Sequence, residues 1–201
     1  MSGSVMLRQR VAVALLNCGM LASGAALAQR PPAAAVPLGT PPPAEAMPRV
    51  EFVFEERVTL APATVLGDTD LGRRQYIPIT GGTIAGPKLK GEVIPGGWDF
   101  QLGYSGGCGT LSADYFLRAD DGTVIHILNQ AFNCGMAGRG GERSWFRPTF
   151  EAPKGSAYEW LTRGTFVASL ELERPNGQAA GATPEAAAPA MAIRIKFYQI
   201  K

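Results

Sequence analysis

From Val50 onward the sequence is a series of short β-favouring runs separated by Gly, Pro, Asn and Asp, with almost no helical periodicity. Turn-forming residues between β-favouring runs are typical of strands joined by tight turns. Because closing a sheet removes its exposed edges, we expect an all-β fold: a single antiparallel β-barrel of about eight to nine strands. The predicted strands are Val50–Leu60, Gln75–Ile79, Lys88–Ile94, Trp98–Tyr104, Leu111–Ala119, Thr123–Gln130, Ser144–Glu151, Gly164–Arg174 and Met191–Ile200. The segment Tyr158–Leu161 is predicted to form a helical turn that caps one end.

The first residues have the pattern of an export signal. Arg8 and Arg10 precede an uncharged apolar run, and Ala26-Leu27-Ala28 matches the small-x-small pattern at which signal peptidase cuts. We therefore expect a signal peptide over 1–28 and a periplasmic or secreted protein. The apolar run is short for a membrane span, so no stable membrane anchor is expected, with a retained anchor helix as the alternative.

Two stretches are too poor in large apolar side chains to build a core. Residues 29–48 are rich in Pro and Ala and are predicted to be a disordered linker. Residues 177–190 are rich in Ala and Pro and are predicted to be a flexible insertion within a barrel domain over 49–201. About 150 residues suffice for one core and not for two.

The charge balance argues against nucleic acid as a partner. The chain has 19 Lys and Arg against 17 Asp and Glu, and loss of the two signal-peptide arginines makes the totals equal. A neutral chain with dispersed charges lacks the basic surface that phosphate backbones require. The sequence does not determine the oligomeric state, and a homo-oligomer stays an open alternative.

For one hairpin the sequence predicts which residues lie opposite each other. Asp120-Asp121-Gly122 is a strong turn signal, because glycine accepts the positive φ of primed turns. Pairing outward from this turn sets Cys108 opposite Cys134. With two cysteines left after signal removal, an oxidising compartment predicts a disulfide between them, and two free thiols are the alternative.

Several short segments together carry a family pattern. They are Arg73-Arg74, Ile77–Thr83, Gly86–Gly91, Pro95-Gly96-Gly97 followed by Asp99 and Gln101, Asp120-Asp121-Gly122, Phe146-Arg147, Tyr158 with Trp160-Leu161, and Phe166-Val167. These segments resemble a bacterial and fungal family known as domain of unknown function 3237. The resemblance extends from about Val50 to the C-terminus, and it implies a β-barrel of modest size similar in outline to allene oxide cyclase and dirigent proteins. Thr162 and Ser112 depart from residues common in the family.

No motif in the sequence names a reaction. Serine-hydrolase, P-loop and dinucleotide patterns are absent, and the single His126 cannot form a histidine-rich metal centre. We therefore expect no metal and no cofactor. The pairs Gly81-Gly82 and Gly96-Gly97 suit either phosphate contacts or β-bulges; because no helix N-terminus follows them, bulges are favoured.

Asp99 is the carboxylate of most interest. Strand alternation places Trp98 and Phe100 on one face and Asp99 and Gln101 on the other, which by itself favours an aromatic core face and Asp99 in water. The family resemblance, with Gly96-Gly97 as a bulge, favours Asp99 in the barrel lumen. A half-buried carboxyl group there would have a raised pKa and could act as a general base or acid.

The hairpin centred on Asp120-Asp121-Gly122 has two further polar residues on an apolar face. Tyr115 and Asn129 share that face with Leu117, Ile125 and Ile127, which is typical of a ligand pocket and equally of a core tyrosine. On the opposite face Asp114, Arg118 and His126 are predicted to form a surface cross-strand cluster.

The sequence thus predicts a periplasmic barrel that binds a small apolar or aromatic molecule. It would act as a cofactor-independent acid–base lyase, isomerase or cyclase, with Asp99 and Tyr115 as catalytic candidates. The alternative is a non-catalytic carrier, or a structural barrel with a filled lumen. Arginines at a barrel mouth would hold an anionic group. The predicted substrate-binding residues are Arg73, Gln101, Asn129, Arg147, Glu159 and Trp160.

Overall fold

The structure, a computed structural model, describes residues 37–134, 144–173 and 191–201. The predicted signal peptide and the predicted insertion at 177–190 lie outside these ranges, as does the first part of the predicted linker. Within the linker, residues 37–48 are exposed and contain one short 3-10 turn, Ala44–Ala46. In the part of the chain that is described, no helix is both long and apolar enough to span a membrane.

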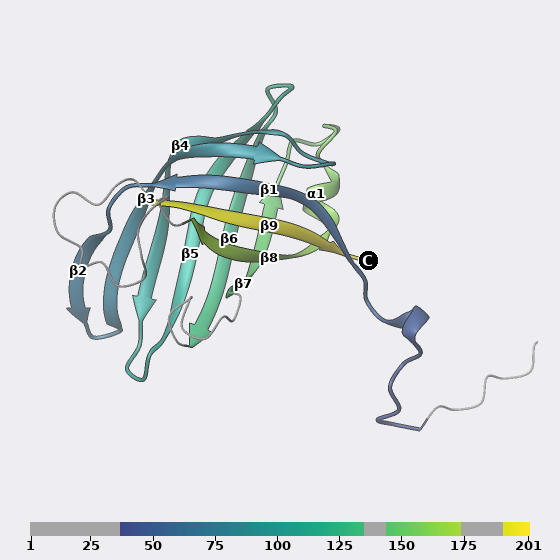
Figure 1. The fold of residues 1–201 in the computed structure, drawn as a ribbon, viewed down its shortest axis with the longest axis horizontal. Coiled ribbons are helices and arrows are strands. Elements are labelled where there is room, and N and C mark those ends of the chain that lie inside the picture. The colour runs from purple at the N-terminus through teal and green to yellow at the C-terminus, as the bar shows by residue number, and fades with distance from the viewer. Residues whose placement is uncertain (1–36, 135–143, 174–190) are drawn as a thin grey trace, which may run out of the picture. The chain divides into compact units, whose positions relative to one another are not determined.

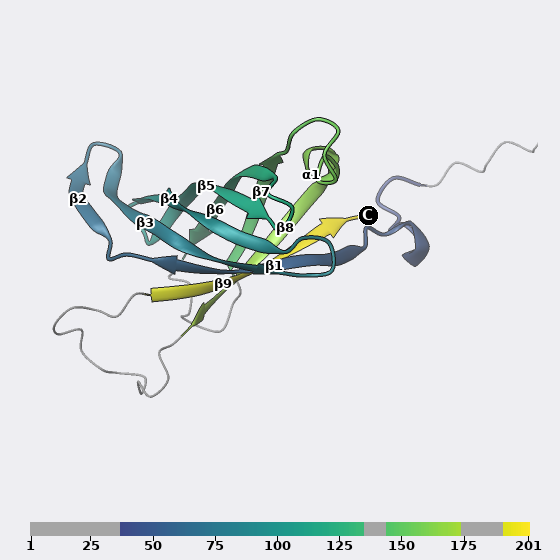
Figure 2. The same ribbon diagram turned by 90° about the horizontal axis from the view of Figure 1, so that it is seen from above.

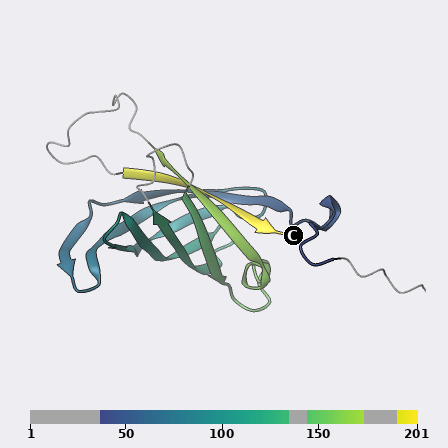
Figure 3. The ribbon, with the colours of Figure 1, turned by 90° about the horizontal axis from the view of Figure 1, so that it is seen from below.

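In the described ranges, the barrel consists of eight antiparallel strands with one further strand at its edge. Figures 1, 2 and 3 show how the strands wrap around the barrel. The sheet order is β1-β9-β8-β7-β6-β5-β4-β3-β2, and pairing of β1 with β3 closes the barrel while β2 pairs only with β3. The predicted all-β antiparallel barrel is confirmed. The strands are β1 (Val50–Leu60), β2 (Thr64–Thr69), β3 (Gly72–Ala85), β4 (Gly91–Gly103), β5 (Cys108–Ala119), β6 (Val124–Cys134), β7 (Ser144–Glu151), β8 (Thr165–Glu173) and β9 (Met191–Ile200).

The strand prediction was wrong at β2, β3 and β4. The two runs predicted on either side of Pro95-Gly96-Gly97 form one strand, β4, because this segment is a bulge at which the register shifts between Ile94 and Trp98. A similar shift lies between Ile79 and Gly82, so β3 is longer than the predicted Gln75–Ile79. The favoured interpretation of both glycine pairs as bulges is confirmed. The mostly exposed β2 was missed.

Gly82 shows why a glycine is needed where the barrel closes. It lies opposite Val58 of β1 and has a φ of 155°. A Cβ atom at this position would come within 2.2 Å of the Arg57 carbonyl oxygen. The close approach of β1 and β3 therefore requires a residue without a side chain.

One end of the barrel is filled by aromatic rings. Phe54 stacks on Phe197 with ring centroids 4.5 Å apart, and Phe150 meets both rings edge-on. Near them lies α1 (Trp160–Arg163), whose Leu161 is buried in the core and whose Trp160 packs beside Phe166. The predicted helical turn is present and begins at Trp160. With this end filled, an internal cavity can persist only toward the opposite end.

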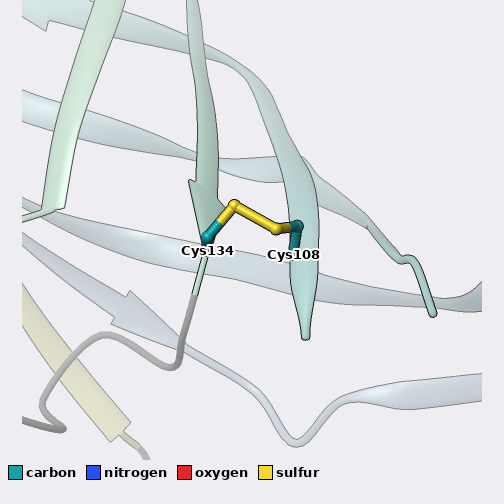
Figure 4. The surroundings of a disulfide bond; sticks show 2 residues. All are labelled: Cys108 and Cys134. Carbon is teal, nitrogen blue, oxygen red and sulfur yellow. A yellow bond between two sulfur atoms is a disulfide. The ribbon is translucent and has the colours of Figure 1, made fainter. Parts of the chain in front are cut away.

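The Cys108–Cys134 disulfide joins β5 and β6 at that opposite end (Figure 4). The register runs without a shift from Cys108 opposite Cys134 to Arg118 opposite Val124, as the turn at Asp120-Asp121-Gly122 predicts. The predicted disulfide and hairpin are both confirmed.

Reduction of this disulfide should lower the free energy of unfolding by about 3.5 kcal/mol, because the reduced chain regains the entropy of the open loop. Thermal unfolding with and without reductant measures the effect. A variant with Cys108→Ser and Cys134→Ser is the control, and its unfolding should not respond to reductant. Two titratable thiols at these positions in unreduced native protein would contradict the prediction.

Candidate functional site

A cavity of about 470 Å³ opens at the disulfide end of the barrel. The residues around it come from β1, β3 to β9 and the turn before β5, so the cavity is continuous with the barrel lumen. Its lining residues are Leu60, Arg73, Gln75, Ile77, Asp99, Gln101, Leu102, Gly103, Gly107, Cys108, Gly109, Thr110, Leu111, Asn133, Phe146, Leu170, Leu172, Met191 and Ile193.

Most of the polar lining comes from β3 and β4, and Thr110 and Asn133 add polar groups from β5 and β6. The antiparallel register of β3 and β4 sets Gln75 opposite Gln101 and Ile77 opposite Asp99. The Gln75 amide donates a hydrogen bond to Gln101 Oε1 at 2.7 Å, and Gln101 Nε2 donates to Asp99 Oδ2 at 2.7 Å. The walls from β1, β7, β8 and β9 contribute only apolar residues to the lining. The cavity therefore suits an amphiphilic or aromatic molecule with few polar groups.

The structure decides between the two interpretations of Asp99 in favour of the lumen. Trp98 and Phe100 are 42% and 45% exposed and pack against Tyr76 on the outer face, so the aromatic side chains lie outside. Asp99 Oδ1 is shielded from solvent and has no hydrogen-bond partner among the described residues. Burial raises the pKa of the Asp99 carboxyl group, and the Gln101 side chain and, to a smaller extent, the Ser112 backbone amide offset part of that rise.

A second carboxyl group, which was not predicted from the sequence, is fully buried in the barrel interior. Glu56 of β1 is 0% exposed, and the Tyr115 hydroxyl donates a hydrogen bond to Glu56 Oε2 at 2.7 Å. Burial raises the pKa of Glu56 to about 8, although the bond from Tyr115 acts in the opposite direction. Burial, together with the nearby Glu56 and Asp99 charges, raises the pKa of the Tyr115 phenol.

Alternation along β1 could have revealed Glu56. Phe54, Val58 and Leu60 are buried at every second position, and Glu56 falls in the same phase. A carboxyl group in the inward phase of a strand is uncommon without a partner or a function. The neighbouring Glu55 and Arg57 made the segment resemble a solvated charge run.

Tyr115 and Asn129 lie on the buried face that the hairpin predicted, but neither belongs to the cavity lining. The amide of Asn129 lies close enough to the Tyr115 hydroxyl to lower the pKa of the phenol, an effect smaller than that of burial. We call Glu56, Asp99, Tyr115 and Asn129 the polar cluster. Asp99 alone belongs both to this cluster and to the cavity wall.

The other predicted substrate-binding residues are scattered. Arg73 and Gln101 line the cavity, with Arg73 largely exposed at its rim. Arg147 is exposed on β7 between inward-facing neighbours, so it does not reach the cavity. Glu159 binds Arg163 and the Gly155 amide, while Trp160 packs on the core beneath Lys88; neither lines the cavity.

The outer-face cluster forms in part as predicted. His126 Nε2 lies 2.7 Å from Asp114 Oδ1. Arg118 instead forms an ion pair with Glu92 of β4 at 3.0 Å, because Glu92 is its cross-strand neighbour. Both pairs are partly exposed and remote from the cavity. In the described ranges no three metal-ligating side chains come together.

Gly97 makes room for the Tyr115 side chain. A Cβ atom at Gly97 would lie 2.4 Å from Tyr115 Cβ and 2.9 Å from the Asp114 carbonyl oxygen. Gly97→Ala should therefore destabilise the protein by about 1–3 kcal/mol through overpacking, measured by denaturant unfolding. Gly103→Ala on the same strand is the control, because its Cβ would meet nothing closer than 3.8 Å. Equal stability of the two variants would contradict this packing.

Comparison with known proteins places this chain in a family. The pattern of a family described as "Protein of unknown function (DUF3237)" matches residues 48–200. A UPF0311 protein from Clostridium acetobutylicum is 37% identical over 132 residues, which are 58% of this chain and 82% of that protein. A solved β-barrel-like protein from Acinetobacter baumannii superimposes with a TM-score of 0.61 at 28% identity, covering 81% of this chain and 99% of that one.

One relative has a name that states an activity. The hydroalkoxylation enzyme phnH from Penicillium herquei is 35% identical over 86 residues, which are 42% of this chain and 56% of that enzyme. A solved structure of an enzyme from Penicillium herquei superimposes on this chain with a TM-score of 0.57 at 24% identity, covering 82% of this chain and 100% of that one, so the barrel fold is found in an enzyme.

Proposed function

The chain belongs to the family described as protein of unknown function DUF3237, and we propose that it is a cofactor-independent acid–base enzyme of the isomerase or cyclase type. Its substrate is a small, largely apolar or aromatic molecule, and it acts in the periplasm or outside the cell. The observation that carries this proposal is the Asp99 carboxyl group, whose unpartnered oxygen lies in the wall of an otherwise mostly apolar cavity.

Asp99 suits the role of proton acceptor for physical reasons. Its pKa is raised by burial, which makes the carboxylate a stronger base than an exposed aspartate. Gln101 holds one carboxylate oxygen and is itself held by Gln75, so the other oxygen is oriented without being occupied. At the rim, Arg73 would bind a carboxylate or phenolate group of the substrate.

The named relative supports chemistry of this type. A hydroalkoxylation adds an O–H group across a carbon–carbon double bond. The hydroxyl loses its proton, a C–O bond forms, and a carbon gains a proton, so that neither an oxidant nor a cofactor is consumed. A group such as Asp99 that can take up and return a proton within the cavity fits this proton balance.

Blocking the cavity tests whether a ligand binds there. Leu170 lines the cavity from β8, so Leu170→Trp should place an indole ring in the space and lower the affinity for aromatic ketones, enones and hydroxylated phenylpropanoids by at least about tenfold. Fluorescence or calorimetric titration measures this change. Thr149→Trp, which adds the same ring to the exposed face of β7, is the matched control and should bind normally.

The competing function, a carrier without catalysis, predicts the same loss of binding but no turnover by the parent protein. A structural barrel predicts no saturable binding at all. Binding that Leu170→Trp leaves unchanged would overturn the proposed site.

A further inference from the structure

Unpaired polar atoms converge around Tyr115 in the barrel interior. Glu56 Oε1, Asp99 Oδ1 and both side-chain polar atoms of Asn129 are shielded from solvent, and none has a hydrogen-bond partner among the residues described. They come from three strands, β1, β4 and β6, and Tyr115 of β5 lies between them. Since a buried polar atom without a partner costs free energy, such a group of atoms is suited to a polar ligand atom.

Glu56 contributes to this group as a neutral acid. The polar side chain that contacts it is Tyr115, which has Asn129 and Asp99 as further polar neighbours, and the cross-strand partners of Glu56, Ile84 and Ile195, are buried and apolar. No cation among these neighbours stabilises a Glu56 carboxylate. Burial raises the pKa of Glu56 to about 8, so at neutral pH it carries a proton that it can donate.

The hydrogen-bond donors in this group of residues indicate which kind of ligand atom would bind there. The Glu56 carboxyl, the Tyr115 hydroxyl and the Asn129 amide are all neutral, and none is a lysine or arginine that would be expected for a phosphate. A protonated Glu56 can donate to the Tyr115 oxygen in place of accepting from it, and the Tyr115 hydroxyl proton is then free for the ligand. Such a set matches a single oxygen that gains negative charge during a reaction. Asp99, the adjacent base, belongs both to the polar cluster and to the cavity wall.

We propose that Glu56, Tyr115 and Asn129 form an oxyanion-binding recess and that the substrate is an enolisable or conjugated ketone. Its carbonyl oxygen enters the recess while the remainder of the molecule occupies the cavity. This inference rests on the proposed function, because it takes Asp99 as the group that removes the proton.

The proton-transfer step balances without any co-reactant. A C–H bond beside the carbonyl breaks, and its proton goes to Asp99 Oδ1. The electron pair of that bond forms a carbon–carbon double bond, and the carbonyl π pair moves onto the oxygen held in the recess. Asp99 then returns the proton to a carbon of the enolate, which restores the carbonyl group in an isomerised product.

Binding of p-nitrophenol tests the recess without any need for turnover. Its phenolate resembles the enolate oxygen, and its absorbance reports the ionised form. In Asp99→Asn, whose amide resembles the protonated aspartate that accompanies an enolate, the phenolate should bind at least about tenfold more tightly than in the parent protein. Adding Tyr115→Phe should weaken this binding by about 10- to 100-fold, because a hydrogen bond to a charged oxygen is lost.

Glu56→Gln, also made in the Asp99→Asn background, tests whether Glu56 donates a hydrogen bond to the ligand or only supports the structure. With Glu56 present, affinity for the phenolate form should fall as the pH rises through about 8, because the ionised carboxylate repels the anion. With Glu56→Gln, the amide still donates and cannot ionise, so this loss should disappear. A merely structural Glu56 would not shift the pH dependence.

Asp114→Asn on the outer face of β5 is the control and should change neither binding nor its pH dependence. If Tyr115→Phe and Glu56→Gln also change neither, the recess holds only internal water and the inference is overturned, while the role of Asp99 in turnover is unaffected. Phenolate binding that responds as expected, together with full turnover by Asp99→Asn, would support the recess and overturn the proposed base.

Discussion

Asp99→Asn is expected to lower turnover by about two to four orders of magnitude, the usual contribution of a positioned general acid or base. The amide keeps nearly the same volume and can still bond Gln101, so the cavity and the stability of the fold should change little. Steady-state kinetics on any compound that the parent protein converts gives the ratio. The loss should appear in kcat, because the missing proton acceptor affects the reacting step.

The pH profile provides a second expectation for the same residue. With Asp99 acting as a base, kcat/KM should fall as the pH drops through its pKa, which burial places above that of an exposed aspartate. Asp114→Asn, on the neighbouring strand but outside the barrel, is the matched control and should keep full activity. Full activity in Asp99→Asn would show that the proposed base is wrong.

Glu56→Gln should make the protein markedly more stable at pH 9. Folding raises the pKa of Glu56 from 4.5 to about 8, so the folded protein holds this proton more tightly than the unfolded chain. Between these values the parent protein loses stability as the pH rises, by an amount on the order of 5 kcal/mol in total. The variant has no proton to lose, and its unfolding midpoint at pH 9 should be higher by about 10 °C.

Thermal unfolding of both proteins from pH 5 to pH 9 measures this difference. Below the unfolded-state pKa the two curves should converge, because Glu56 is then protonated in both states. Glu92→Gln removes an exposed carboxylate that binds Arg118 and serves as the control; its curve should follow that of the parent. Parallel curves for Glu56→Gln and the parent would mean that Glu56 is not held as a neutral acid.

Local signals in the sequence were sufficient where a turn fixes the register. Asp120-Asp121-Gly122 placed the β5–β6 hairpin, and with it the disulfide and the buried face of Tyr115 and Asn129. The family resemblance indicated a barrel and favoured Asp99 in the lumen. The glycines and prolines at Gly81-Gly82 and Pro95-Gly96-Gly97 were misleading as strand ends, because they mark bulges inside continuous strands.

The remainder depends on contacts between residues distant in the sequence. The hydrogen bond between Tyr115 and Glu56 joins residues on β5 and β1, and no turn relates these two strands. Closure of the barrel through β1 and β3 gives Glu56 its buried position, whereas its neighbours Glu55 and Arg57 suggest a solvated segment. Likewise, Arg147 was grouped with the site by its type, and its place in the alternation along β7 puts it outside.

A crystal structure with a converted ketone or its product bound would test the central claim most directly. We predict that the ligand occupies the cavity at the disulfide end of the barrel, with a reacting atom within about 2.6–3.2 Å of Asp99 Oδ1. A ligand bound elsewhere on the barrel, or one in the cavity that leaves Asp99 bonded only to Gln101, would contradict it.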